Sequence, residues 1–163
     1  MIPQRKRREI LVQLLYSASV DRHQDARATL ALLSALTLDE AGCQKIIDAM
    51  GAISLFWDQI DELITDAARD YEVRRISRVE CAALRLALFE LCYEKKTPPK
   101  VIIAEAVRIS RKFGTKEGGA FVNAVLDAVA RKKGACLTTD VAQESSEKET
   151  ECRVKLTSSK ASA

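Results

Sequence analysis

Histidine, proline and glycine are scarce in this chain of 163 residues, which has one, three and six of them respectively. A Ser-His-Asp or Cys-His arrangement has only His23 to draw on, and His23 lies in a polar stretch. The five cysteines include no C-x-x-C pair, so a zinc site of ordinary spacing is not supported. Glycine-rich phosphate-binding motifs are missing as well. We therefore expect no enzyme, no metal and no cofactor.

No apolar run reaches the length that a membrane-spanning helix needs. The chain begins with a basic run followed by apolar residues, as a signal peptide does, but Glu9 and Gln13 interrupt that pattern. The odd number of cysteines, without the spacing of a disulfide framework, indicates reduced thiols. These features predict a cytoplasmic protein with no membrane partner.

Helix-forming residues dominate what is present, and 47% of the residues are apolar while 30% are charged. Apolar residues recur at helical spacing, and no stretch alternates as a strand would. The sequence predicts an all-α fold of six or seven helices packed as bundles. The expected helices cover residues 4–19, 25–36, 39–68, a mostly apolar central helix from 77, a helix from 99 to 113, and one from 115 to 133.

Local signals predict where these helices begin and end. Thr37 to Glu40 and Ser77 to Glu80 read as capping boxes. Pro98-Pro99 should stop the central helix, with Pro99 opening the next one, and Gly114 should end that helix as a left-handed cap. Thr115 is a fair N-cap for the last helix. Gly51 either divides the 39–68 segment or only weakens it, and the sequence leaves both readings open.

Residues 134–163 differ in composition from the rest of the chain. They are rich in Ser, Thr, Glu and Lys and have little apolar periodicity. Such a segment cannot bury enough apolar surface to offset the entropy of ordering. We expect one folded domain over 1–133 and a disordered tail over 134–163.

Four adjacent cations, Arg5, Lys6, Arg7 and Arg8, form the strongest functional signal in the residues themselves. Clustered cations attract phosphate and release counterions from nucleic acid. A solvated helix start is the plainer interpretation of the same run. Further cations recur between residues 74 and 78 and between 108 and 112, and the sequence does not show whether they share a surface with the first group.

Gly118-Gly119, followed by Phe121 and Asn123, is a second unusual feature, because glycine weakens a helix by roughly 1 kcal/mol relative to alanine. The pair permits either tight helix packing or close approach of another molecule to the backbone. Phe121 fits either the core or a stack on an unpaired base. Asn123 fits either a base edge or a bond to a neighbouring loop.

In three places the sequence resembles the NusB family of bacterial transcription antitermination factors. RKRREILVQLLYS resembles the family's arginine-rich start, RISRVECAALRLALFEL its central helix, and PPKVIIAEAVRISRKFG with AFVNAVLDAVA its C-terminal pair. The resemblance covers most of residues 4–133. Two positions depart from the family pattern, since Ala104 replaces the Asn of N-E-A and Ala124 replaces the Gly of F-V-N-G.

The resemblance implies a function that is not enzymatic. Members of the family bind the single-stranded boxA element of nascent RNA, notably ribosomal RNA leaders, together with the ribosomal protein NusE. The heterodimer helps RNA polymerase, within an antitermination complex, to read through terminators. The family fold is two helical bundles packed across each other.

The same resemblance assigns roles to individual residues. Arg5, Lys6, Arg7 and Arg8 match the RNA-binding segment. Glu117 and Phe121 match a turn and an aromatic residue that approach RNA. Tyr16 and Glu80 match positions near the NusE contact and the RNA path, although Glu80 also closes a predicted capping box.

Two alternatives remain open at this point. The first is a NusB-like domain of the kind fused to RNA cytosine methyltransferases, but the chain has no room for a cofactor-binding α/β domain. The second is a helical protein-interaction module without an RNA role. Because some members of the family self-associate, the resemblance also leaves open whether the protein is a monomer or a homodimer.

Overall fold

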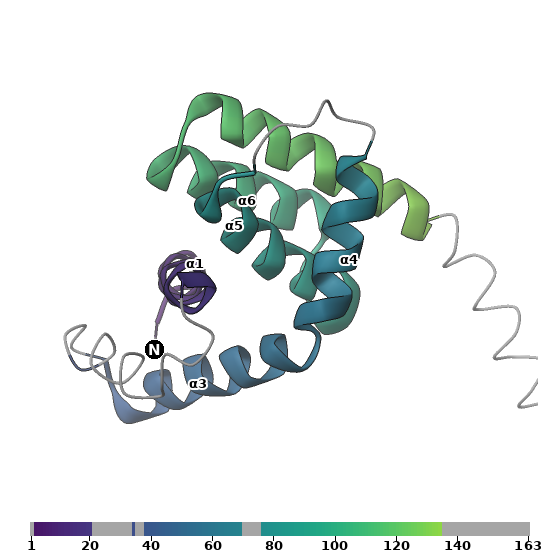
Figure 1. The fold of residues 1–163 in the computed structure, drawn as a ribbon. Coiled ribbons are helices and arrows are strands. Elements are labelled where there is room, and N and C mark those ends of the chain that lie inside the picture. The colour runs from purple at the N-terminus through teal and green to yellow at the C-terminus, as the bar shows by residue number, and fades with distance from the viewer. Residues whose placement is uncertain (1, 21–33, 35–37, 70–75, 135–163) are drawn as a thin grey trace, which may run out of the picture. The chain divides into compact units, whose positions relative to one another are not determined.

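The computed structural model describes residues 2–20, 34, 38–69 and 76–134, and within these ranges the ordered elements are helices with no strand (Figure 1). The prediction of an all-α fold is confirmed. The elements are α1 (Gln4–Val20), α3 (Glu40–Leu55), α4 (Trp57–Ala68), α5 (Arg78–Phe89), the π-helical turn η1 (Glu90–Glu94), α6 (Pro99–Phe113) and a last helix over residues 116–134.

Some of the sequence predictions fall outside the described residues. They are His23, the cations at 74 and 75, the tail over 135–163 and, apart from residue 34, the helix expected over 25–36. The chain divides into two compact units, Met1–Ala128 and Val129–Ala163. All packing described below lies within the first unit. Of the second unit, the structure describes residues 129–134, which end the last helix.

Helix α5 is the central element, as its nearly uniform apolar character predicts. It packs against α1, α3, α4 and α6. Its buried apolar residues are Ala82, Ala83, Leu84, Leu86, Ala87, Leu88 and Phe89. The predicted capping box is confirmed, because Ser77 Oγ accepts a hydrogen bond from Glu80 N at 3.2 Å and Glu80 Oε2 accepts one from Ser77 N at 3.0 Å.

Helix α1 lies between α3 and α5 (Figure 1). The predicted apolar stripe is buried at Ile10, Leu11, Leu14 and Leu15. Burial of a branched aliphatic side chain contributes about 1.5–3 kcal/mol, so this stripe is sufficient to hold α1 in place. The first turn of α1, which carries the basic run, is therefore attached to the core by the turns that follow it.

The 39–68 segment is divided at Phe56 and not at Gly51. Gly51 lies inside α3, with open space around the position where a Cβ would be. Phe56 separates α3 from α4, and its backbone N–H donates to Ile53 O at 3.1 Å. The predicted capping box from Thr37 is wrong, because α3 begins at Glu40 and its N-cap is Asp39, whose side chain accepts a hydrogen bond from Gly42 N. Thr37 itself lies outside the described residues.

Helix α5 passes into η1 and ends before the two prolines. Lys95 follows in the left-handed region with φ 51°, and its N–H donates to Glu90 O at 2.9 Å. The expectation that Pro98-Pro99 stops the helix is therefore wrong by one turn. Pro99 does occupy the first turn of α6, as predicted.

Gly114 ends α6 without the predicted left-handed conformation. Its φ and ψ are −128° and −130°. The reason for a glycine here is space, because a Cβ would lie 2.8 Å from Ser110 O and 3.3 Å from Val79 Cγ1. The predicted N-cap of the last helix is present, since Thr115 Oγ1 accepts a hydrogen bond from Gly118 N at 3.0 Å.

Candidate nucleic-acid interface

The four cations of the first turn of α1 have different environments. Arg5 and Lys6 are exposed, Arg7 is half-buried and Arg8 is buried. Successive residues of a helix point in directions about 100° apart, so a run of four cations cannot face one ligand together. The run is thus a set of separate contacts and not a single basic patch.

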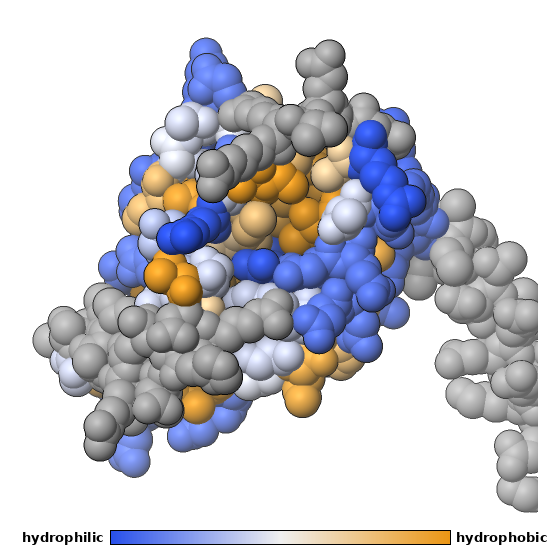
Figure 2. All heavy atoms as spheres, viewed as in Figure 1, coloured by the Kyte–Doolittle hydropathy of each residue, from blue (hydrophilic) through white to orange (hydrophobic). Residues whose placement is uncertain are grey.

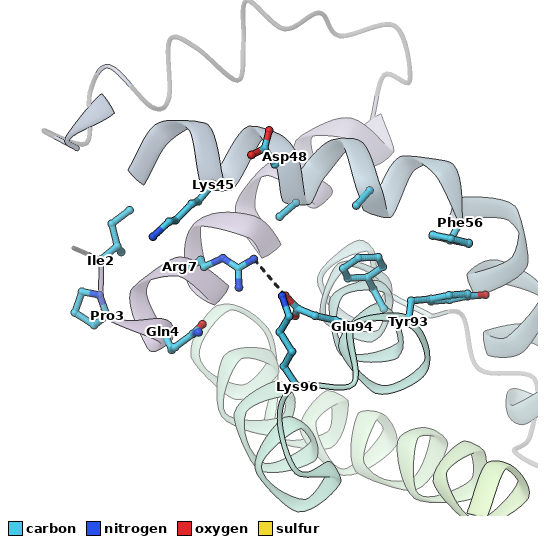
Figure 3. Close-up of a pocket in the computed structure, with 13 residues that line it drawn as sticks. Ile2, Pro3, Gln4, Arg7, Lys45, Asp48, Phe56, Tyr93, Glu94 and Lys96 are labelled. Carbon is cyan, nitrogen blue, oxygen red and sulfur yellow. Dashed lines mark ion pairs between the residues drawn. The ribbon is translucent and has the colours of Figure 1, made fainter. Parts of the chain in front are cut away.

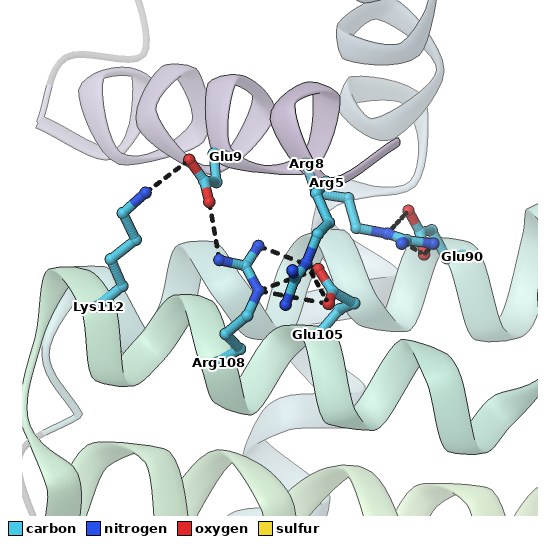
Figure 4. Close-up of polar contacts among 7 residues, drawn as sticks. All are labelled: Arg5, Arg8, Glu9, Glu90, Glu105, Arg108 and Lys112. Carbon is cyan, nitrogen blue, oxygen red and sulfur yellow. Dashed lines mark hydrogen bonds and ion pairs between the residues drawn. The ribbon is translucent and has the colours of Figure 1, made fainter. Parts of the chain in front are cut away.

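Arg8 is a core residue, which corrects its predicted place on an RNA-binding surface. It is 6% exposed. Its Nε and Nη2 each donate to the Glu90 carboxylate at 2.9 Å, in a bidentate pair (Figure 4). Glu90 belongs to η1, so the pair joins the first turn of α1 to the end of the central helix.

Two acidic residues connect α1 to the cations of α6. Glu9 Oε1 accepts a hydrogen bond from Arg108 Nη1 at 2.8 Å, and Glu9 Oε2 accepts one from Lys112 Nζ at 2.8 Å. Glu105 accepts hydrogen bonds from Arg108 Nη2 at 3.0 Å and Arg5 Nε at 3.2 Å (Figure 4). We call these five residues the α1–α6 ionic cluster.

The cluster answers the question that the sequence left open. Arg108 and Lys112 of α6 share a surface with Arg5 of α1, although they are about a hundred positions apart in the chain. Three cations surround two carboxylates, which leaves one positive charge in excess. Arg5 is the most exposed of the three, with 68% of its side-chain surface accessible.

The ion pairs of the cluster shift the pKa of its members. Hydrogen bonds from Lys112 and Arg108 lower the pKa of Glu9. Burial acts to raise the pKa of Glu105, but hydrogen bonds from Arg108 and Arg5 outweigh it and lower that pKa. Hydrogen bonds to Glu105 and Glu9 raise the pKa of Arg108. All three groups are therefore held in their charged forms near neutral pH.

We expect Glu9→Gln to lower the free energy of unfolding at pH 7 by about 1–2 kcal/mol, because it removes the charge that two cations share. A carboxyl with a lowered folded-state pKa contributes stability above its unfolded pKa, here about 4.5, and loses it as the pH falls through the folded value. The difference in urea midpoint between the wild type and the variant should therefore shrink below pH 4.5. A difference that is independent of pH would contradict this role for the Glu9 charge.

Gly118 and Gly119 face side chains of the protein itself. A Cβ at Gly118 would lie 2.4 Å from Glu80 Oε1, and a Cβ at Gly119 would lie 2.6 Å from Arg111 Cγ. Both glycines are buried. The structure thus favours tight packing and not the exposed backbone that an approaching molecule would need.

Helix α6 lies between the two predicted RNA-contacting regions. Its Lys112 contacts Glu9 of α1, and its Arg111 lies against Gly119 in the first turn of the last helix. In that helix Glu117 is exposed, and Phe121 is half-buried. Asn123 is also exposed. The first turn of α1 and the beginning of the last helix are therefore both joined to α6 by its cationic side chains.

The two residues predicted to contact a protein partner differ in accessibility. Tyr16 is 42% exposed on α1, and Val20, four residues later on the same face, is exposed as well. Glu80 is 4% exposed and closes the capping box, so the structure does not support a direct partner contact for it. Figure 2 shows apolar side chains between hydrophilic ones on one face of the molecule, so exposed apolar surface is not confined to Tyr16 and Val20.

Sequence reasoning missed Glu9 and Glu105, which order the exposed cations. The motifs that contain these residues do not show this role, because Glu9 finds both of its partners on α6, whereas Glu105 finds one on α1 and one on its own helix. Only the presence of opposite charges on two amphipathic helices hinted at such pairing. Among the described residues, no group of three or more His, Cys, Asp and Glu side chains is placed to hold a metal ion, and no helix is long and apolar enough to cross a membrane.

Comparison with known sequences identifies the relatives of this chain. The sequence profile of the NusB family matches residues 5–131. The transcription antitermination protein NusB of Geobacter sulfurreducens is 34% identical over 129 residues, which are 76% of this chain and 90% of that protein. The corresponding protein of Syntrophus aciditrophicus is 35% identical over 132 residues, covering 77% of this chain and 78% of that protein.

Solved structures with the same fold include that of T. maritima NusB. It is 30% identical, has a TM-score of 0.69, and the match covers 80% of this chain and 92% of that one. A structure of the antitermination factors NusB and NusE in complex with double-stranded RNA matches with a TM-score of 0.70. That match has 20% identity and covers 79% of this chain and 96% of the other, so it supports the fold alone.

Proposed function

Because the chain belongs to the NusB family, we propose that it is a transcription antitermination factor that binds boxA-type single-stranded RNA together with the ribosomal protein NusE. The observation that carries the proposal is the α1–α6 ionic cluster. It combines an exposed Arg5 with Arg108 and Lys112 on one surface, and the exposed Lys6 follows Arg5 in the chain. The family is one of transcription antitermination proteins and not of enzymes.

In this proposal the cations bind phosphate groups, which supplies affinity and fixes the position of the RNA strand on the protein. Phosphate groups of a single strand replace part of the contact that Glu9 and Glu105 make with Arg5, Arg108 and Lys112. The two carboxylates keep the three cations ordered in the free protein, so that less side-chain entropy is lost when RNA binds. Arg8 is not among the RNA contacts, since its guanidinium is committed to Glu90.

Base recognition is assigned to the beginning of the last helix. Phe121 is half-buried, so one part of its ring packs on the protein and the rest is accessible to an unstacked base. Glu117, which is exposed in the first turn, can accept a hydrogen bond from a base amino group. In single-stranded RNA both the face of a base and its amino group are accessible, because the bases are not held in a duplex.

The protein partner is assigned to α1. Tyr16 and Val20 provide exposed apolar surface at helical spacing, which suits a contact with NusE. RNA then contacts the beginning of α1, and NusE contacts the end of the same helix. The heterodimer delivers boxA RNA of ribosomal RNA leaders to the RNA polymerase antitermination complex. The function proposed is read-through of terminators.

We expect the double variant Arg5→Ala/Lys6→Ala to bind a labelled boxA-type RNA about tenfold more weakly than the wild type in the presence of NusE. Each lost phosphate contact should also reduce the slope of log K against log salt by about 0.7. The measurement is a titration by fluorescence anisotropy at several salt concentrations, with NusE present and absent. The fold should be preserved, because both side chains are exposed and cations at a helix N-terminus are unfavourable to the macrodipole.

A matched control is Arg69→Ala/Lys132→Ala, which removes the same charge from two exposed residues that are not among the proposed RNA contacts. It should bind RNA as the wild type does. Equal binding by the wild type and by the α1 variant, without enhancement by NusE, would contradict the proposal and favour a helical protein-interaction module. Equal binding of a duplex of the same sequence would contradict the single-stranded part of the proposal.

A further inference from the structure

A groove lies on the other side of the first turn of α1, between α3 and η1 (Figure 3). Its volume is about 870 Å³, within the range of roughly 300–1,000 Å³ that is usual for small-ligand pockets. No residue of the α1–α6 ionic cluster lines this groove. Its lining residues come from the N-terminal segment, α1, α3, the junction after α3, the end of α5 and the turn that follows α5.

Three aromatic rings form one wall of the groove. Phe56 and Tyr93 are stacked, with ring centroids 4.0 Å apart and an interplanar angle of 21°. Phe89 lies 6.1 Å from Tyr93 and 6.4 Å from Phe56. Phe56 and Tyr93 are only half-buried, so the stack presents aromatic surface to the groove. Such a surface can stack on any nucleic-acid base, because every base presents a planar aromatic face.

Charged side chains surround this aromatic wall. The cations are Arg7, Lys45 and Lys96, and the carboxylates are Asp48 and Glu94. Glu94 lies between two of the cations, with Arg7 Nη2 at 3.9 Å and Lys96 Nζ at 3.7 Å from its Oε1 (Figure 3). The groove therefore carries one positive charge in excess, and Lys96 is 80% exposed.

The backbone that positions the groove is unusual. Tyr93 and Glu94 belong to the π-helical turn η1, and Lys95 closes it in the left-handed region. Both features are uncommon for ordinary residues and tend to occur at functional sites. The Arg8–Glu90 pair secures the beginning of this turn from the core side. Tyr93 and Glu94 are thus presented by a helical turn that is tied to the core, while Phe56 comes from the junction of α3 and α4.

We propose that this groove binds an unpaired nucleotide of the RNA, immediately outside the segment held by the α1–α6 ionic cluster. The base lies against Phe56 and Tyr93, and the adjoining phosphates contact Lys45 and Lys96. The proposal rests on the function proposed above and extends its RNA path around the first turn of α1.

The closeness of the groove to the α1–α6 ionic cluster favours RNA over an acidic peptide as the occupant. Arg5 of this turn points to Glu105 of α6, whereas Arg7 points to Glu94 at the groove. The two sites are therefore separated by the width of one helix, about 10–12 Å with its side chains, which a few nucleotides can span. An aromatic wall with cations at its edge also matches the two parts of a nucleotide, a planar base and an anionic phosphate.

The test compares two labelled RNAs in the presence of NusE. One is the boxA-type core, and the other carries a few extra unpaired nucleotides at its 5′ or 3′ end. The quantity measured is the ratio of their affinities for each protein, because an effect of charge on all RNAs cancels in that ratio. The proteins are the wild type, Lys45→Glu/Lys96→Glu, Tyr93→Leu, and the control Arg69→Glu/Lys132→Glu, each checked for its fold by circular dichroism.

We expect one of the two extensions to increase the affinity of the wild type and of the control about tenfold. The gain should be lost in Lys45→Glu/Lys96→Glu and in Tyr93→Leu, while the core RNA still binds. No gain from either extension in a wild type that binds the core RNA, or a gain that persists in both groove variants, would overturn the groove proposal and leave the proposed function intact. Loss of NusE binding in the groove variants, with the gain retained, would identify a protein-docking surface instead. A wild type that binds neither RNA would refute the proposed function and the groove proposal with it.

Discussion

Replacing Arg8 by alanine will lower the free energy of unfolding by about 3–5 kcal/mol, because it leaves the Glu90 carboxylate buried without its partner. A loss of that size is a large part of the 5–15 kcal/mol that stabilises a typical domain. Urea unfolding followed by circular dichroism measures it. The same change at Arg5, whose side chain is mostly exposed, should cost less than about 1 kcal/mol.

The double variant Arg8→Met/Glu90→Leu separates the cost of an unpaired charge from the worth of the pair. Both charges are then absent, and apolar side chains of similar length fill the space, so stability should return close to that of the wild type. An Arg8→Ala variant as stable as Arg5→Ala would show that the buried pair does not hold α1 to η1. It would also return Arg8 to the candidate RNA contacts.

Replacing Gly118 by alanine will lower the free energy of unfolding by about 2 kcal/mol, after the gain in helix propensity is set against the cost of overpacking. The new Cβ would meet Glu80 Oε1 at 2.4 Å, and that carboxylate is held by the backbone N–H of Ser77. Either the last helix moves away from α5 or the capping box opens. If the last helix moves, close packing against α5 is lost. If the capping box opens, a helix cap worth about 1 kcal/mol is lost.

Gly51→Ala is the matched control, because it adds the same methyl group in an exposed part of α3 where no atom lies within 4 Å. It should stabilise the protein by up to about 1 kcal/mol through helix propensity. Thermal and urea unfolding of the two variants should therefore shift in opposite directions. Shifts of equal sign would show that the contact between Glu80 and Gly118 does not limit the packing of the last helix.

The sequence alone determined the class of fold and much of its local detail. The apolar stripes of α1 and α5, the Ser77–Glu80 capping box, Pro99 at the start of α6 and the Thr115 cap are all present as predicted. Each of these signals acts within about one turn of helix, so its physical cause is contained in a few neighbouring residues. The resemblance to the NusB family could be recognised for the same reason, because it rests on short sequence motifs that occur along the chain in the family's order.

Element ends were less predictable where two causes compete. Gly51 weakens a helix but does not end it, because the turns on both sides are buried through Ile46 and Ile53. The central helix ends at Glu94 before its prolines, where the chain adopts a π turn that suits the Arg8–Glu90 pair. In both cases packing against other helices outweighs the local preference.

Only the tertiary structure decided which charged residues belong to the core and which to the surface. Arg8 and Glu90 are 82 positions apart, and Arg108 and Glu9 are 99 apart, so no local pattern relates them. A run of four cations reads as one motif in the sequence, yet helical geometry sends Arg5 to α6, Arg7 to the aromatic groove and Arg8 into the core. The sequence therefore determined that the amphipathic helix α1 begins with four cations. The packing of α1 on its neighbours decided what each of these cations contacts.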